Sequence, residues 1–134
     1  MAVLRHETMP VRSDEDCLLV RQLVRRWAAE QGFSLVEQTK VVTAASEIAR
    51  NTVIYGGGGN LRLEALNDGD RKGLRLTFED KGPGIRDIEQ ALKDGFTTGN
   101  GLGLGLGGAK RLSSEFEIHS QVGSGTTVRL VRWK

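Results

Sequence analysis

The chain has 134 residues, of which 38% are hydrophobic and 27% charged, and this is the composition of one ordinary globular domain with no room for a second. Its formal net charge of +2 is too small to indicate a nucleic-acid-binding surface, and no apolar run has signal-peptide form or the roughly 20 residues of a membrane span. The single cysteine, Cys17, excludes an internal disulfide and fits a reducing compartment, so we expect a cytoplasmic protein.

The first part of the chain predicts one strand and one helix. Residues 2–11 follow a rough strand pattern, and the proline near its end suits an edge strand or a strand end. Ser13 can cap a helix in which apolar residues recur at a spacing near 3.6, and Gly32 can end it. The apolar positions of this helix are Leu18, Leu19, Leu23, Val24 and Trp27.

A second helix is predicted by a capping box. Ser34 and Glu37 are spaced so that each side chain can satisfy an amide donor at a helix start. The helical pattern continues to about Tyr55, where the glycine run 56–59 ends it.

Two groups of titratable residues indicate no chemistry by themselves. Arg21, Arg25 and Arg26 lie at helical spacing and are interpreted as the solvated side of the first helix, with a partner-docking face as the alternative. His6 and His119 lie far apart in predicted strands, so we interpret them as structural or surface residues.

The middle of the chain predicts a β-hairpin with one buried face. Leucine and alanine alternate with polar residues over 60–65, residues 67–70 form a turn, and apolar residues alternate again over 74–78. Asp80 follows at the exit of the second strand.

The remaining elements predict an α+β fold. A short helix is expected around 87–93 and another over 105–116, and residues 116–119 and 127–133 predict a closing hairpin. The order of elements predicts a two-layer α/β sandwich in which a mixed, mostly antiparallel sheet has its helices on one face.

The second predicted helix carries a pair of polar residues, Glu47 and Asn51, one turn apart. At this spacing two side chains lie about 5–6 Å apart on one helix face and can share a ligand. The amide oxygen of Asn51 suits Mg²⁺, and the carboxylate of Glu47 can act as a base toward a hydroxyl or a water beside a γ-phosphate. The alternative is two exposed polar residues on an amphipathic helix.

A second motif follows the hairpin. An ionised Asp80 only accepts hydrogen bonds, so it matches the exocyclic amino group of adenine and rejects the carbonyl of guanine. Gly82 and Gly84 allow a base to lie close against the backbone, and the hydroxyl of Thr126 can support the same base directly or through water. The alternative is an ordinary turn at 80–84.

The third motif is the glycine-rich run 101–108. Gly103, Gly105 and Gly108 satisfy a dinucleotide-binding pattern, but a polar loop precedes them where that fold requires a buried strand, and only 26 residues follow. The alternating leucines argue against a flexible linker. We interpret the run as a phosphate-binding loop that leads into a helix.

In this order, and with the closing pair Gly125 and Thr126, the three motifs resemble the N, G1 and G2 boxes of the GHKL ATPases, which share the Bergerat fold. Within that superfamily, the segments 46–51, 94–98 and 107–112 most resemble the RsbT-type serine/threonine switch kinases of bacterial stressosomes. The resemblance extends over nearly the whole chain.

The resemblance implies ATP and Mg²⁺ as cofactors and a role for each motif residue. It makes Glu47 the catalytic base, Asn51 the Mg²⁺ ligand and Asp80 the adenine contact, with an ATP lid over 86–100. The implied nucleotide-binding residues are Asn51, Asp80, Gly82, Gly84, Ile85, Gly101, Leu102, Gly103, Leu104, Gly105 and Thr126. The run 56–59 is more glycine-rich than this family leads us to expect.

The resemblance also implies partners. The enzyme would phosphorylate a serine or threonine of a small STAS-domain antagonist, which would release the kinase from its partner, and the freed kinase would activate a PP2C-type phosphatase. A STAS-domain scaffold is a further implied partner. The nearest alternative is an anti-sigma factor kinase that sequesters a sigma factor, and a third is a non-catalytic module whose docking surface is shaped by ATP.

Overall fold

The computed structural model describes residues 1–85, 87–92 and 105–134, which form a five-stranded sheet with helices packed on it. In chain order the elements are β1 (Ala2–Val11), α1 (Asp14–Glu30), α2 (Leu35–Ile54), β2 (Gly59–Asp68), β3 (Arg71–Asp80), α3 (Ile88–Ala91), α4 (Leu106–Arg111), β4 (Glu115–Gln121) and β5 (Gly125–Trp133).

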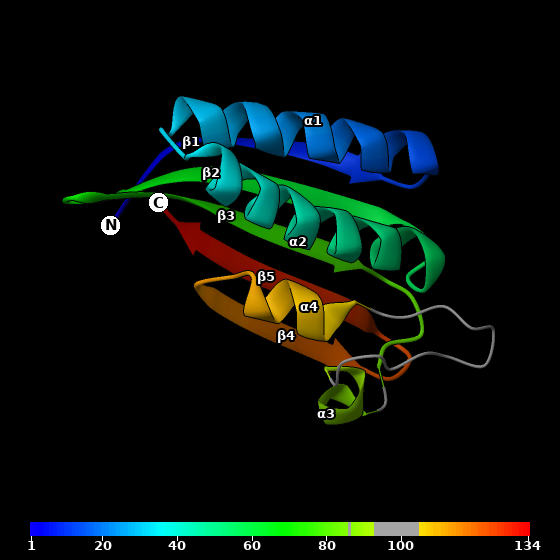
Figure 1. Ribbon diagram of the computed structural model, residues 1–134. Coiled ribbons are helices and arrows are strands. Elements are labelled where there is room, and N and C mark those ends of the chain that lie inside the picture. Colours follow the sequence, from blue (N-terminus) through cyan, green and yellow to red (C-terminus); the bar gives the residue numbers. More distant parts are fainter. Residues whose placement is uncertain (86, 93–104) are drawn as a thin grey trace.

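The sheet and the helices form two layers. The strand order is β1-β2-β3-β5-β4, and each of these neighbouring pairs is antiparallel. The sequence predicts a mixed, mostly antiparallel sheet, whereas the described sheet is entirely antiparallel. Helices α1, α2 and α4 lie on the same face of the sheet (Figure 1). This arrangement confirms the predicted α+β sandwich. Within the described part of the chain, no helix has both the length and the hydropathy needed to cross a bilayer.

The predicted caps place the starts of α1 and α2. The hydroxyl of Ser13 accepts a hydrogen bond from the amide of Asp16 at 3.2 Å. The hydroxyl of Ser34 accepts from the amide of Glu37 at 3.2 Å, and the Glu37 carboxylate accepts from the amide of Ser34 at 3.0 Å. Each bond satisfies a donor that a helix start leaves without an intrahelical partner, so both helices begin where the sequence predicts.

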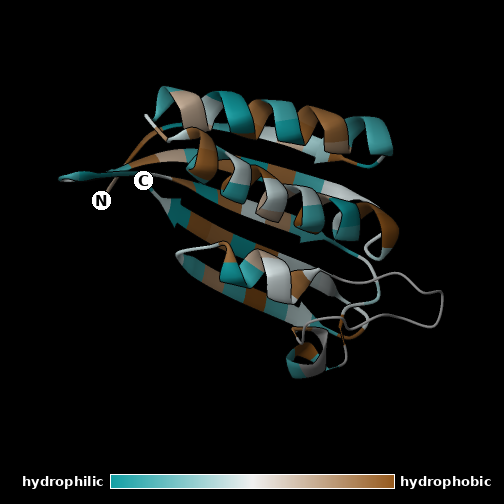
Figure 2. Ribbon diagram, viewed as in Figure 1, coloured by the Kyte–Doolittle hydropathy of each residue, from teal (hydrophilic) through white to brown (hydrophobic). Residues whose placement is uncertain are grey.

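The core lies between the helices and the sheet. Hydrophobic and hydrophilic segments interleave along α1, α2 and the strands (Figure 2), as expected for elements with one buried face. On α1 the buried positions are Cys17, Val20, Leu23, Val24, Trp27 and Ala28. Leu18 and Leu19, which the spacing assigns to the apolar face, are instead 44% and 45% exposed. The basic residues Arg21, Arg25 and Arg26 are exposed, as predicted.

The prediction for the second half of the chain is wrong at one boundary. Helix α4 ends at Arg111, whereas the sequence predicts a helix that continues to Phe116. The amide of Ser114 donates to the carbonyl of Val131, and Phe116 pairs with Leu130 in the sheet. Pairing with β5 therefore outweighs the local helical pattern from Glu115 onward.

The face of the sheet away from α1, α2 and α4, here called the open face, carries a charged pair. Register places Glu64 on β2 opposite Arg75 on β3, and the guanidinium donates two hydrogen bonds to the carboxylate at 2.8 and 3.0 Å. Arg62 lies 3.7 Å from the same carboxylate. The Glu64 side chain is only 8% exposed. These hydrogen bonds from Arg75 hold the pKa of Glu64 below its ordinary value.

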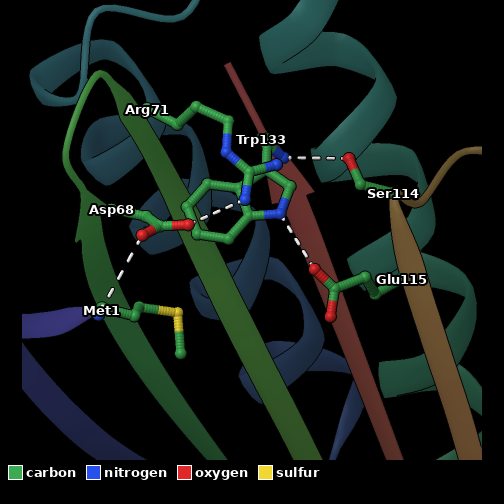
Figure 3. A network of polar contacts seen from close by, with 6 residues as sticks. All are labelled: Met1, Asp68, Arg71, Ser114, Glu115 and Trp133. Carbon is green, nitrogen blue, oxygen red and sulfur yellow. Dashed lines mark hydrogen bonds and ion pairs between the residues drawn. The ribbon is translucent and has the colours of Figure 1, made fainter.

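A polar network joins strand ends at the end of β3 opposite Asp80 (Figure 3). The carboxylate of Asp68 lies 4.0 Å from the amino terminus and accepts from Arg71 at 2.8 Å. The Arg71 guanidinium lies over the Trp133 ring, 4.1 Å from its centroid, and the indole N–H donates to Glu115 at 2.9 Å. These contacts connect the start of β1, the β2–β3 turn, the end of β5 and the start of β4.

Candidate functional site

The site begins on α2, where Glu47 and Asn51 border the buried stripe of the helix. Ile48 and Thr52, which follow them, are buried against the sheet, whereas Glu47 and Asn51 themselves are half-buried. The capping box sets the phase of the helix, so both polar side chains fall on the edge of the core, within reach of solvent.

Asp80 lies at the end of β3, directly opposite Thr126 on β5. Its Oδ1 atom accepts hydrogen bonds from the amide of Gly82 at 2.9 Å and from the amide of Thr126 at 3.3 Å. Both amides donate to the same oxygen, so they fix the orientation of the carboxylate. An acceptor held in this way suits recognition of an amino group.

Gly56 brings α2 and Asp80 together. Its amide donates to the carbonyl of Asn51 at 3.2 Å. A Cβ atom at position 56 would lie 2.6 Å from Oδ2 of Asp80, and one on Gly82 would lie 2.7 Å from the Cα of Gly56. Only glycine fits between the helix end and the loop without a shift of the backbone. This close approach explains the first glycine of the run 56–59.

The start of α4 lies against Glu47. Gly105 caps α4 in the left-handed conformation, with φ of 66°, and a Cβ atom there would collide with the Glu47 carboxylate. The structure therefore brings Gly105, the last implied nucleotide-binding residue of the predicted phosphate loop, to the predicted base. Gly101, Leu102, Gly103 and Leu104 lie outside the described residues, as does most of the predicted lid, of which only 87–92 is described.

Sequence reasoning missed one polar residue of the site, Ser120 on β4. Its hydroxyl accepts from the amide of Ile85 at 2.7 Å and lies 2.8 Å from the hydroxyl of Thr126. Gly84, beside Ile85, approaches the backbone of Gln121 so closely that a side chain there would collide with it. Alternation along the last hairpin places Ser120 on the same face as Thr126, and this pattern could have identified Ser120 from the sequence.

A cavity of about 720 Å³ opens at this end of β3, β5 and β4. Asp80, Ser120 and Thr126 line it on the helix-covered side, and Ile88 of α3 contributes an apolar wall. Glu79 and His119, which also line it, belong to the open face, so the cavity extends around the strand ends. Its volume lies in the range of small-molecule and cofactor sites.

The family model for the histidine kinase-like ATPase domain matches residues 12–132. The chain therefore belongs to the histidine kinase-like ATPase domain family, also known as the GHKL family, and membership in this family implies ATP binding.

Two curated relatives narrow the class within that family. The chain is 44% identical to the serine/threonine-protein kinase RsbT of Bacillus subtilis (strain 168), over 92% of each chain. It is 30% identical to an anti-sigma F factor of Thermoanaerobacter sp. (strain X514), over 84% of this chain and 82% of the relative. The chain is thus a homologue of RsbT, within the RsbT-like serine/threonine kinases of the anti-sigma factor family.

Two solved structures share this fold. The crystal structure of the RsbU and RsbW domains of Rv1364c from Mycobacterium tuberculosis superposes with a TM-score of 0.65 and 26% identity, over 97% of this chain and 32% of that longer chain. The catalytic domain of histidine kinase ThkA superposes with a TM-score of 0.56 at 14% identity, over 94% and 95%. The second likeness concerns the fold alone.

Proposed function

We propose that this protein is a cytoplasmic serine/threonine kinase that uses ATP and Mg²⁺ to phosphorylate a small STAS-domain antagonist in bacterial stress signalling. The observation that carries the proposal is the contact of three motifs through two glycines. Gly56 joins the end of α2 to Asp80, and Gly105 joins the start of α4 to Glu47. The 44% identity to RsbT supports the choice of reaction.

In this proposal the base end of the nucleotide is bound by the sheet. The Asp80 carboxylate, oriented by the amides of Gly82 and Thr126, accepts from the amino group of adenine. The hydroxyl of Thr126 supports the base directly or through a water molecule. The backbone of Gly82, Gly84 and Ile85 borders the base.

The amide oxygen of Asn51 on α2 is a suitable ligand for Mg²⁺. Mg²⁺ prefers oxygen ligands and keeps most of its octahedron for phosphate and water, and Asn51 offers an amide oxygen at the solvent-accessible edge of the core. When bound, the ion would neutralise charge on the phosphates. The phosphate contacts of Gly101, Leu102, Gly103 and Leu104 stay a prediction.

Glu47 is the proposed base. Its half-buried carboxylate, held beside the backbone of Gly105, would orient the serine or threonine hydroxyl of the partner and accept its proton as that oxygen attacks the γ-phosphorus and ADP leaves. The product carries close to two additional negative charges, which favours release of the kinase from the modified partner. Release would free the kinase for a PP2C-type phosphatase or a STAS-domain scaffold.

Transfer of labelled phosphate tests this function. The purified chain is incubated with γ-labelled ATP, Mg²⁺ and a STAS-domain protein from the same organism. We expect label on a serine or threonine of that protein, and label that depends on Mg²⁺. Binding of ADP without any transfer would support the non-catalytic module instead.

The identity to anti-sigma F factors favours a second candidate function, sequestration of a sigma factor. Co-purification of the chain with sigma factors of the same organism, in the presence of ATP, separates the two. A stable complex with a sigma factor would favour the anti-sigma function, and label transfer without such a complex would favour the switch kinase.

A further inference from the structure

Ser120 connects three segments that border the proposed adenine site. Its hydroxyl accepts from the amide of Ile85 at 2.7 Å, lies 2.8 Å from the hydroxyl of Thr126, and lies 3.3 Å from the carbonyl of Gly125. Ile85 lies within the loop after Asp80, whereas Gly125 and Thr126 begin β5. Ser120 is half-buried and lines the cavity together with Asp80 and Thr126.

The hydrogen-bonding capacity of these hydroxyls limits how Thr126 can act. A serine hydroxyl donates one hydrogen bond and accepts two. If Ser120 accepts from Ile85 and donates to the carbonyl of Gly125, its remaining acceptor site takes the proton of Thr126. The Thr126 oxygen then offers only lone pairs to the cavity. If Ser120 instead donates to Thr126, the Thr126 proton is directed elsewhere and the carbonyl of Gly125 loses the hydrogen bond from Ser120.

Backbone contacts hold Thr126 beside Asp80, so the direction of the Thr126 hydroxyl proton affects the proposed adenine site. The amide of Thr126 donates to the Asp80 carboxylate at 3.3 Å, so the two residues are joined directly. Ser120 reaches the Thr126 hydroxyl from β4, and it also accepts from the amide of Ile85 in the loop after Asp80. One hydroxyl therefore contacts both the Thr126 side chain and the loop after Asp80.

We propose that Ser120 is a positioning residue for adenine recognition, which acts by fixing the donor and acceptor directions of the Thr126 hydroxyl. The inference deepens the proposed function and rests on it, since it assumes that the base binds at Asp80 and Thr126. Ser120 borders the base end of the proposed site, beside Thr126 and Asp80, so its effect is expected on nucleotide affinity and base selectivity and not on turnover at saturating ATP.

A double-mutant cycle tests the inference. The variants are Ser120→Ala, Thr126→Val and the double variant, with Ser124→Ala as a matched control, because Ser124 is an exposed serine that lines the same cavity. Dissociation constants of ADP and GDP with Mg²⁺ are measured by calorimetry, and unfolding by urea. We expect Ser120→Ala and Thr126→Val each to weaken ADP binding by about 3- to 10-fold, the effect of one hydrogen bond.

The inference requires the losses of ADP affinity in Ser120→Ala and Thr126→Val to be non-additive. The ADP dissociation constant of the double variant should lie within about 2-fold of that of whichever single variant binds ADP more weakly. Ser120→Thr, which keeps a hydroxyl, should bind ADP with an affinity near that of the wild type. The preference for ADP over GDP should fall in Ser120→Ala and stay unchanged in Ser124→Ala. If Ser120→Ala does not fold, Ser120→Cys retains the side-chain size with a weaker hydrogen-bonding group and should show a smaller loss in the same direction.

Two results would overturn the inference while leaving the proposed function intact. One is unchanged ADP affinity and selectivity in Ser120→Ala, and the other is fully additive losses in the double variant, which would mean that Ser120 acts separately from Thr126. A wild-type chain that binds neither ADP nor ATP would overturn the proposed function, and this inference with it.

Discussion

Two acidic residues of the β2–β3 hairpin, one on each face of the sheet, are held in different ways. On the open face, both oxygens of Glu64 accept hydrogen bonds from one guanidinium. On the helix-covered side, Asp80 receives two backbone amides on a single oxygen, and it borders a cavity. The first arrangement uses the carboxylate to join two strands, and the second orients a carboxylate toward a space that a ligand can enter.

The difference indicates where stability and function reside in this fold. The open face carries long side chains whose charges compensate each other locally in the group Arg62, Glu64 and Arg75. The helix-covered side combines an apolar core with polar residues at its margin, among them Glu47 and Asn51. Substitutions on the open face should therefore change stability, and substitutions at the margin should change chemistry.

The largest effect is expected for Glu47→Ala. Loss of a general base reduces transfer by roughly 10²- to 10⁴-fold, while ADP affinity and the free energy of unfolding should stay near wild-type values because Glu47 is only half-buried. Initial rates of label transfer at saturating ATP measure the loss. The control is Glu117→Ala on the open face, where the side chain is 60% exposed. Equal rates in Glu47→Ala and Glu117→Ala would show that Glu47 is not the base.

The next largest effect is expected for Glu64→Ala. Removal of one partner leaves the Arg75 guanidinium, only 20% exposed, without its carboxylate, and this should lower the free energy of unfolding by about 3 kcal/mol. Urea unfolding measures the loss, and ADP affinity of the folded fraction should not change.

A second substitution sharpens this prediction. The double variant Glu64→Leu with Arg75→Met removes both charges and should recover most of the lost stability, because no buried charge is left without a partner. A double variant as unstable as Glu64→Ala would show that the loss arises from packing on this face and not from the unpaired guanidinium.

The elements that the sequence predicts well are those with local signals at their ends. Ser34 and Glu37 mark the start of α2, and the glycine run marks its end. The turn around Gly69 separates two alternating segments that do form β2 and β3. The predicted end of α4 is wrong because the residues around Phe116 pair with β5, and a local pattern does not contain that information.

The contacts of the site depend on which segments meet. The chemistry of Glu47, Asn51 and Asp80 follows from residue type and spacing, whereas the role of Gly56 follows only from the approach of α2 to the loop after β3. Ser120 has no motif of its own, and its partners lie on β5 and in a loop 35 residues away. The pairing of Glu64 with Arg75 could have been predicted from the sequence, because a two-residue turn fixes the register of a hairpin.

A smaller effect is expected for Asp80→Asn, which probes the oriented carboxylate. The asparagine oxygen should keep the two amides that now donate to Oδ1, so its amino group would take the place of Oδ2 and oppose the amino group of adenine. ADP binding should weaken by about 10- to 100-fold, as for loss of a hydrogen bond to a charged group. Calorimetry with ADP and GDP measures both affinity and selectivity.

The control for this variant is Glu79→Gln, the neighbouring acid on the opposite face, which is exposed. It should bind ADP like the wild type. If Asp80→Asn binds ADP as tightly as Glu79→Gln does, the base does not contact Asp80, and the assignment of the two faces to stability and function fails on the functional side.

The smallest effect is a pH dependence of stability that comes from Glu64. Hydrogen bonds from Arg75 hold the pKa of Glu64 in the folded protein below the ordinary 4.5, so at pH values just below 4.5 the unfolded chain binds more protons than the folded one. The stabilisation is therefore complete above about pH 4.5 and is lost as the pH falls through the folded-state pKa. In urea titrations from pH 7 to pH 3, the difference in unfolding free energy between wild type and Glu64→Gln should narrow on acidification. Since Asp80 is not replaced, both proteins should keep equal ADP affinity at pH 7. A difference that stays constant over this range would mean that the Glu64 charge does not stabilise the open face.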